Sequence, residues 1–280
     1  IPAMSLADRG WYQVIVSNPS GAVKSVFMLN GASSGRAPGS WTSGASLGGG
    51  MLRWRNIPPA GLSDVVAIAS DSVALKSDGT VVTWPWTEET GATSSTIVPV
   101  PSGLNNVVAI AAGAGVLAVK ADGTVVAWGS NISGPLTVPP DLDHVVAVAC
   151  GVQTWLALRA DGSVVEVGSN PSGPRPMPSG LNGVVAIAAG LFFSVAARDD
   201  GTVVSWGEMG VPDGLGNVVA LASSYEHVLA LRSDGTVVAW GRNTEGEATV
   251  PTGLSNVVGI AANISSSFAL KSDGTVVGWG

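Results

Sequence analysis

An internal repeat runs through the sequence from residue 59 to the last residue. Each copy has a leader, which reads Pro-x-Gly-Leu-x-x-Val-Val in its complete form at Pro101–Val108, and then a turn of the form Asp-Gly-Thr or Asp-Gly-Ser. The turns recur at intervals of 34 to 44 residues, and their aspartates are Asp78, Asp122, Asp161, Asp200, Asp234 and Asp273. Six copies of this regularity predict an array of similar structural units.

One unit divides into three predicted strands. Val218–Ala222 is a short apolar segment bounded by turn residues, which is typical of a buried strand. His227–Arg232 and Thr236–Gly241 are the second and third strands, joined by a tight turn at Asp234-Gly235, because glycine tolerates the positive φ of such turns. Three-stranded units would leave sheet edges exposed unless they wrap into a ring. The sequence therefore predicts an all-β fold, a β-propeller.

We expect seven blades, with six as the alternative. Met51–Trp54 echoes the third-strand pattern, so a degenerate seventh blade is expected to end there, before the six-repeat propeller of residues 59–280. Residues 31–58 are expected to be an irregular segment together with that degenerate blade. Residues 1–30 are either N-terminal strands of the propeller or the remnant of an immunoglobulin-like domain. The second interpretation depends on Asp8–Val14, which resembles a segment of such domains, with Val14 where a cysteine would stand.

The composition excludes several classes of protein. The chain has 38 glycines and 17 prolines, which excludes a helical bundle because both residues are costly inside helices. Hydrophobic residues make up 46%, too many for a disordered chain. No apolar run reaches the roughly 18 residues that would indicate a membrane-spanning helix. The net charge of −7 argues against nucleic acid and anionic membranes as partners.

The strings Leu229–Gly241 and Leu270–Gly280 carry a family resemblance. Residues 59–280 resemble the regulator of chromosome condensation repeat family, and the short units are similar to bacterial members, which include a secreted inhibitor of β-lactamases. This resemblance implies an extracellular or periplasmic protein that grips a partner with aromatic residues on the loops between first and second strands. The family also includes guanine-nucleotide exchange factors, but this acidic chain lacks their basic tail, and we do not expect that activity.

Those same loops are the most informative part of the repeats. They meet on one face of a propeller, and large aromatic side chains there are typical binding anchors. We predict a face that binds another protein or a small ligand, formed by Gln153, Trp155, Phe192, Phe193, Tyr225, Glu226 and His227. Phe193 fits packing between blades equally well, and the position of His227 favours a structural role. Trp155 is the main expected anchor, so Trp155→Ala should spare folding, whereas Trp240→Ala should remove a repeated packing residue.

Catalytic signals are weak. Two Gly-x-Ser-x-Gly matches, at 31–35 and 44–48, are followed by no predicted helix, as a nucleophile elbow would require. The chain has two histidines, of which His144 lies where other leaders have Asn, Gly or Asp and is expected to be a turn residue. The alternative function is a hydrolase of an ester or lactone, assisted by Ca²⁺ held at the channel mouth by Asp71 and Glu226. Apart from that Ca²⁺, we expect no cofactor.

Overall fold

The computed structural model of the chain describes residues 62–69, 73–84, 86–88, 99–113, 115–131, 134–168 and 176–280, and four short strands that precede them. Those strands are β1 (Tyr12–Gln13), β2 (Met28–Leu29), β3 (Trp41–Thr42) and β4 (Trp54–Asn56). Every regular element of the described residues is a strand, which confirms the all-β class. Among the described residues we find no helix that is long and apolar enough to cross a membrane.

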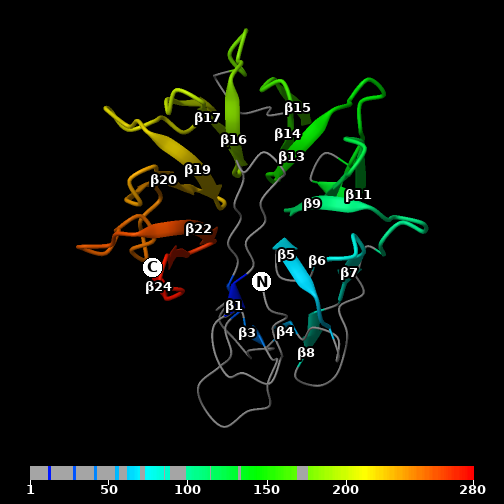
Figure 1. Cartoon of the computed structure of the whole chain (residues 1–280), viewed down its shortest axis with the longest axis horizontal. Helices are drawn as coiled ribbons and strands as arrows, with labels where there is room; N and C mark the ends of the chain where they lie inside the picture. Colours follow the sequence, from blue (N-terminus) through cyan, green and yellow to red (C-terminus); the bar gives the residue numbers. More distant parts are fainter. Residues whose placement is uncertain are drawn as a thin grey trace.

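Six antiparallel sheets follow one another along the chain and lie around a central axis (Figure 1). In each sheet the three strands lie in sequence order, with the first strand nearest the axis. We number these sheets as blades 1 to 6. Blades 1 to 3 are β5 (Val65–Ala69), β6 (Val73–Lys76) and β7 (Val81–Thr83); β9 (Val107–Ala112), β10 (Gly115–Lys120) and β11 (Val125–Asn131), extended by β12 (Gly134–Pro135); and β13 (Val145–Cys150), β14 (Thr154–Arg159) and β15 (Val164–Gly168). Blades 4 to 6 are β16 (Val184–Ala189), β17 (Phe193–Arg198) and β18 (Val203–Gly207); β19 (Val218–Ser223), β20 (His227–Arg232) and β21 (Val237–Gly241); and β22 (Val257–Asn263), β23 (Ser266–Lys271) and β24 (Val276–Trp279).

A further three-stranded sheet joins β3, β4 and β8 (Trp86–Glu88). Its middle strand β4 contains Trp54, from the pattern that predicted a seventh blade, and is antiparallel to both neighbours. Because β8 follows blade 1 in the chain, this sheet lacks the sequential strand order of the six blades. A seventh blade therefore stays a prediction. β1 pairs with β2 in an antiparallel manner, and the predicted boundaries at residues 30 and 58 stay predictions too.

The Asp-Gly turns join the second and third strands of every blade. In blade 2, Oδ1 of Asp122 accepts hydrogen bonds from the backbone N–H of Thr124 at 3.0 Å and from its hydroxyl at 2.6 Å. Gly123 follows with φ +80°, the region that glycine tolerates best. The Thr124 hydroxyl, its backbone N–H and the Lys120 ammonium group lower the pKa of Asp122 to about 2. The turn aspartates are therefore structural residues, as the repeat predicted.

These turns predict a loss of stability in acid. The pKa of Asp122 is about 2 in the folded chain against an ordinary 3.8, so its contribution is complete above about pH 4 and is lost as the pH falls through about 2. The melting temperature of the wild-type chain should therefore fall between about pH 4 and about pH 2. Asp122→Asn should melt earlier at neutral pH and show a smaller fall. An equal fall in both proteins, measured by circular dichroism, would contradict this assignment.

The first strand of each blade is preceded by a residue with positive φ. The φ values are between 52° and 62° at Asp64, Asn106, His144, Gly183, Asn217 and Asn256. His144 is thus a turn residue, as predicted, because Asn, Asp, His and Gly are the residues found most often in this region. The backbone N–H of the residue that follows donates to the carbonyl oxygen of the turn glycine in the preceding blade, as from Val145 to Gly123 O at 3.0 Å. These bonds connect consecutive blades.

The hydrophobic core lies between the blades rather than within them. Between blades 5 and 6, Leu229 and Leu231 of β20 pack against Ile260 and Ala269. Alanines of the first strands, such as Ala220, are buried where the blades converge on the axis. Each blade therefore depends on its neighbours for burial, which is typical of repeat proteins.

Candidate functional site

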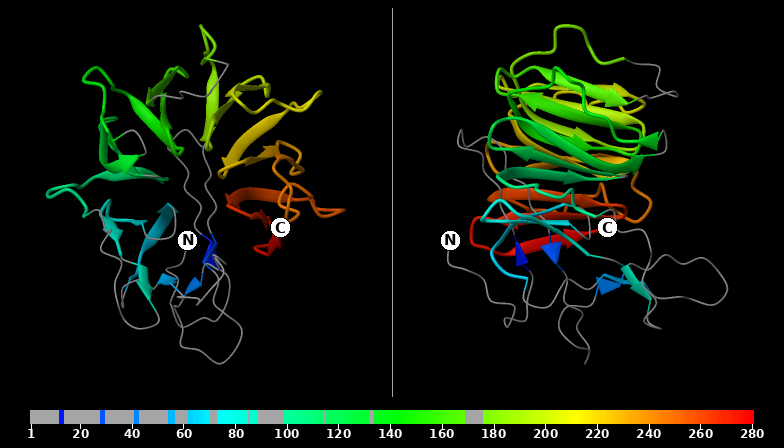
Figure 2. Two further views of the ribbon diagram at one scale, coloured as in Figure 1. Left: turned by 180° about the vertical axis from the view of Figure 1, so that it is seen from behind. Right: turned by 90° about the vertical axis from the view of Figure 1, so that its right-hand side faces the viewer.

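The loops between first and second strands lie on the opposite side of the propeller from the Asp-Gly turns, because each second strand connects the two (Figure 2). We call these two sides the loop face and the turn face. On the loop face, the N–H of Val152 donates to Gly190 O at 3.3 Å, and the N–H of Leu191 donates to Tyr225 O at 2.8 Å. The loops of blades 3, 4 and 5 thus form a continuous rim that is fixed by backbone hydrogen bonds.

Apolar side chains of the loop face are accessible to a partner. Tyr225 of blade 5 is 46% exposed, and Ile264 of blade 6 is 53% exposed. Phe192 of blade 4 is half-buried. We call Phe192, Tyr225 and Ile264 the loop-face patch. Sequence reasoning missed Ile264 because its loop contains no aromatic residue. The available signal was a bulky apolar residue in a two-residue hairpin turn, where the adjoining strands leave its side chain exposed.

The placement predicted for Trp155 is wrong. This residue does not lie in a loop but in β14, between Cys150 of β13 and Val167 of β15, and it is 1% exposed. Its indole packs in a cluster with Leu117 of the preceding repeat and Leu142 of its own leader. The strand begins at Thr154, the counterpart of His227 in blade 5, so Trp155 lies inside the strand and its side chain points into the space between blades. Trp155 therefore offers a partner almost no surface.

Three other residues of the predicted binding face are also buried. Phe193 is buried and packs against Val195 and Val228, so of its two interpretations the structure shows packing between blades. Gln153 and His227 are buried as well. Of the seven residues predicted to bind a partner, Phe192, Tyr225 and Glu226 therefore remain accessible.

Below Tyr225, a buried polar network crosses from blade 5 to blade 6. The hydroxyl of Ser267 donates to the carbonyl oxygen of Glu247 at 2.6 Å, and Ser267 Oγ lies 2.9 Å from His227 Nε2. The Ser267 hydroxyl donates its proton to the carbonyl oxygen of Glu247. Its oxygen must therefore accept a hydrogen bond from the imidazole ring, which places the proton of His227 on Nε2. The side chains of His227, Ser267 and Glu247 are fully buried, and no group of the described residues forms a hydrogen bond with His227 Nδ1.

This network reaches the surface through Arg242. The guanidinium Nη1 lies 3.2 Å from Glu226 Oε2, and Nε lies 3.6 Å from Glu247 Oε1. Burial alone would raise the pKa of Glu247, but hydrogen bonds from backbone amides, including that of Glu245, outweigh it and leave the pKa lowered. A charged, buried Glu247 therefore faces an exposed arginine on the loop face.

The buried His227 predicts a second dependence of stability on pH, in a higher pH range than that of the turn aspartates. Burial lowers the pKa of His227 below its ordinary 6.5, and the charge of Glu247 offsets this only in part. The unfolded chain then binds the proton more strongly, so stability is complete above about pH 7 and falls as the pH drops through 6.5 towards the folded value. Melting temperatures between about pH 7.5 and about pH 5 should fall for the wild type and for His144→Gln, but less for His227→Gln. An unchanged slope in His227→Gln would contradict this.

The described residues give the hydrolase alternative no support. The pair with nucleophile–base spacing, Ser267 and His227, is fully buried and its serine proton is already donated. Within the described residues, no three His, Cys, Asp or Glu side chains come together as a metal site would require. Glu226 pairs with Arg242, and Asp71 lies outside the described residues.

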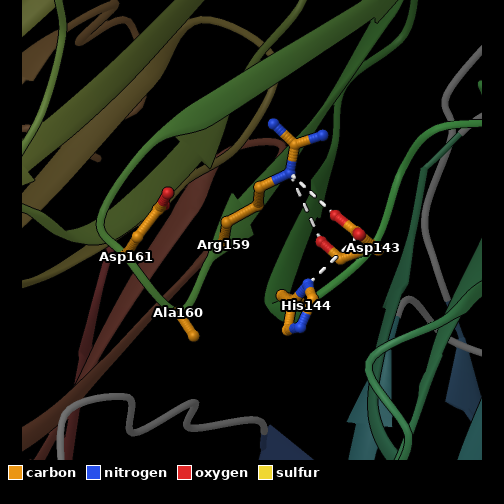
Figure 3. A pocket seen from close by; sticks show the side chains of 5 residues that line it. All are labelled: Asp143, His144, Arg159, Ala160 and Asp161. Atoms are coloured by element: carbon orange, nitrogen blue, oxygen red, sulfur yellow. Dashed lines mark hydrogen bonds and ion pairs between the residues drawn. The ribbon is translucent and has the colours of Figure 1, made fainter.

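A hollow of about 390 Å³ on the turn face is lined by Asp143, His144, Arg159, Ala160 and Asp161 (Figure 3). Here Arg159 donates from Nε to Asp143 O at 3.3 Å and from Nη2 to Asp141 O at 3.2 Å. His144 Nδ1 lies 3.2 Å from Asp143 Oδ2. These polar groups bind one another, so the hollow is a consequence of the turn structure and not an open reactive site.

Comparison with known proteins identifies the repeat. The family model of the regulator of chromosome condensation (RCC1) repeat matches residues 184–210 and 218–247, which contain the strands of blades 4 and 5. A comparison with curated proteins found no match. The matched repeats and the fold together confirm a β-propeller of the RCC1 type, as the sequence predicted.

Solved structures share this fold. The yeast Saccharomyces cerevisiae protein Prp20p is 21% identical with a TM-score of 0.58, over 74% of this chain and 69% of that chain. Yeast RCC1 (Prp20) bound to Kap60 is 20% identical with a TM-score of 0.58, over 77% and 70%. The CRINKLY WD40 ectodomain of the Arabidopsis thaliana receptor kinase ACR4 is 20% identical with a TM-score of 0.55, over 70% of each. At these identities the likeness shows the fold alone.

Proposed function

We propose that this propeller of the RCC1 type is a protein-binding module, and that its partner docks on the loop face. The observation that carries the proposal is the loop-face patch, in which Tyr225 and Ile264 expose about half of their surface on adjacent blades. Exposed apolar side chains on a rigid scaffold are typical of binding surfaces, because little entropy is lost when they are covered. The charged pair of Glu226 and Arg242 beside Tyr225 supplies a polar border.

The structural neighbours support a binding role by analogy. Prp20p has been described with binding properties towards Gsp1p and histones, and also in complex with Kap60. Those partners belong to the yeast protein. For this chain we propose a protein partner of its own, bound by the residues of its loop face.

The test is a capture experiment with matched surface variants. Tagged wild-type chain should retain a partner protein that the triple variant Phe192→Ala, Tyr225→Ala, Ile264→Ala does not retain. With the purified partner, the triple variant should raise Kd by more than about 30-fold, since hot-spot truncations cost more than about 2 kcal/mol. A control, Val108→Ala with Val219→Ala, removes exposed apolar groups of the first strands away from the loops and should bind normally. Equal binding by the triple variant would refute the proposal.

A further inference from the structure

The polar network between blades 5 and 6 departs from the other repeats. His227 pairs with Gly241 at the start of its second strand, and Ser267 occupies the next repeat position in blade 6. At the position of Ser267 the second strands of blades 2 to 5 have Val116, Trp155, Ser194 and Val228. At the position of Glu247 the two earlier repeats with the same Gly-x-Asn spacing have Pro135 and Pro174. Blade 4 also has a serine at the position of Ser267, so this junction differs from these repeats in His227 and in Glu247. Ser267 joins the His227 ring to the backbone carbonyl oxygen of Glu247.

This junction holds two segments of the loop face in place. The first contains Tyr225 and Glu226, directly before His227, and is closed by the hydrogen bond from Ser224 N–H to His227 O at 3.1 Å. The second is the segment 242–249, which is attached to the first by the N–H of Arg242 donating to Glu226 O at 2.8 Å. A displacement of His227 would therefore move both segments.

Glu247 fixes the second segment from inside. Its Oε2 accepts the N–H of Glu245 at 2.8 Å, and its carbonyl oxygen accepts from both Ser267 Oγ and Trp279 Nε1, the latter at 3.0 Å. Its Oε1 faces Arg242, whose guanidinium also holds Glu226. A single buried residue thus connects blade 6 through its backbone carbonyl, and the segment 242–249 and the exposed pair beside Tyr225 through its carboxylate.

We infer that His227, Ser267 and Glu247 are positioning residues for partner recognition: they set the geometry of Tyr225, Glu226 and Arg242 on the loop face without touching the partner. This inference rests on the proposed function. None of the three side chains is accessible, so a loss of binding on their replacement has to act through the segments they hold.

The test compares two serine variants at the same repeat position. Ser267→Ala removes the hydroxyl that joins His227 to Glu247, whereas Ser194→Ala removes one that contacts Glu166 at 3.4 Å between blades 3 and 4. Amide hydrogen exchange of the isolated proteins should be about tenfold faster in Ser267→Ala at residues 224–227 and 242–249, and unchanged in blades 2 to 4. In Ser194→Ala, amide exchange in both segments should be as slow as in the wild type.

Each outcome decides the inference. Unchanged exchange in the two segments of Ser267→Ala overturns it, and so does equally faster exchange in all blades, because that is what loss of stability alone would cause. If Ser267→Ala does not fold, the isosteric Glu247→Gln is judged by the same segments and by the Arg242 Nε–H signal in ¹H–¹⁵N spectra. Faster local exchange combined with full partner binding by the triple variant of the loop-face patch would instead overturn the proposed function, and would reduce the network to a local structural role.

Discussion

Replacing Trp155 with alanine is expected to lower the free energy of unfolding by about 3–5 kcal/mol, the usual cost of deleting a buried aromatic side chain. Trp155 is 1% exposed and packs in a cluster with Leu117 of blade 2 and with Leu142 and Ala157 of its own repeat. Its removal leaves a cavity that the surrounding hydrogen-bonded strands cannot close. For a chain of this size the melting temperature should fall by on the order of 10 °C.

Trp240→Ala is the matched comparison. This tryptophan lies on the third strand of blade 5, is half-buried, and donates from Nε1 to Gly210 O at 2.9 Å. Less apolar surface is lost there, so we expect a cost of about 1–2 kcal/mol. Urea unfolding of both variants measures the difference. The sequence pattern predicted the opposite order, and a larger loss for Trp240→Ala would restore that order and contradict the structural placement of Trp155.

Local features of the repeat were predictable from the sequence. The second strand of blade 5 was predicted at His227–Arg232 and is observed with those bounds, because the turn at Asp234 sets its end. His144 was identified as a turn residue from its counterparts in the other leaders, and it has φ 52°. Such features depend on backbone preferences of a few neighbouring residues, which a repeat displays several times.

Contacts between blades could not be predicted in the same way. The side of the sheet to which Trp155 points depends on the register of β14, and a shift of one residue reverses it. The network of His227, Glu247 and Ser267 joins residues 20 and 40 positions apart, and it exists only because blade 6 packs against blade 5. The exposed patch of Tyr225 and Ile264 likewise follows from the way neighbouring loops leave their tips uncovered.

The glycine that ends the third strand of blade 4 predicts a loss of stability comparable to that of Trp155→Ala. Gly207 has φ +88°, and a Cβ at this position would overlap the carbonyl oxygen of Phe192 and lie 2.8 Å from the Cα of Phe193. The Trp-Gly pair is therefore repeated because the loop of the same blade passes directly over the glycine. Gly207→Ala should lower the free energy of unfolding by about 3 kcal/mol or more, since backbone strain and steric overlap add together.

Gly253→Ala separates these two causes. Gly253 has φ +80°, close to that of Gly207, but nothing lies within 4 Å of the point that a Cβ would occupy. Its substitution therefore carries the backbone strain alone, which costs about 1–2 kcal/mol for a residue in the left-handed region. The difference between the two variants in urea unfolding measures the contact between the third strand and the loop face. Equal losses in Gly207→Ala and Gly253→Ala would show that the loop yields to the added methyl group. In that case Phe192 and Tyr225, whose loops are joined by the bond from Leu191 to Tyr225 O, would be held less rigidly than partner binding on this face requires.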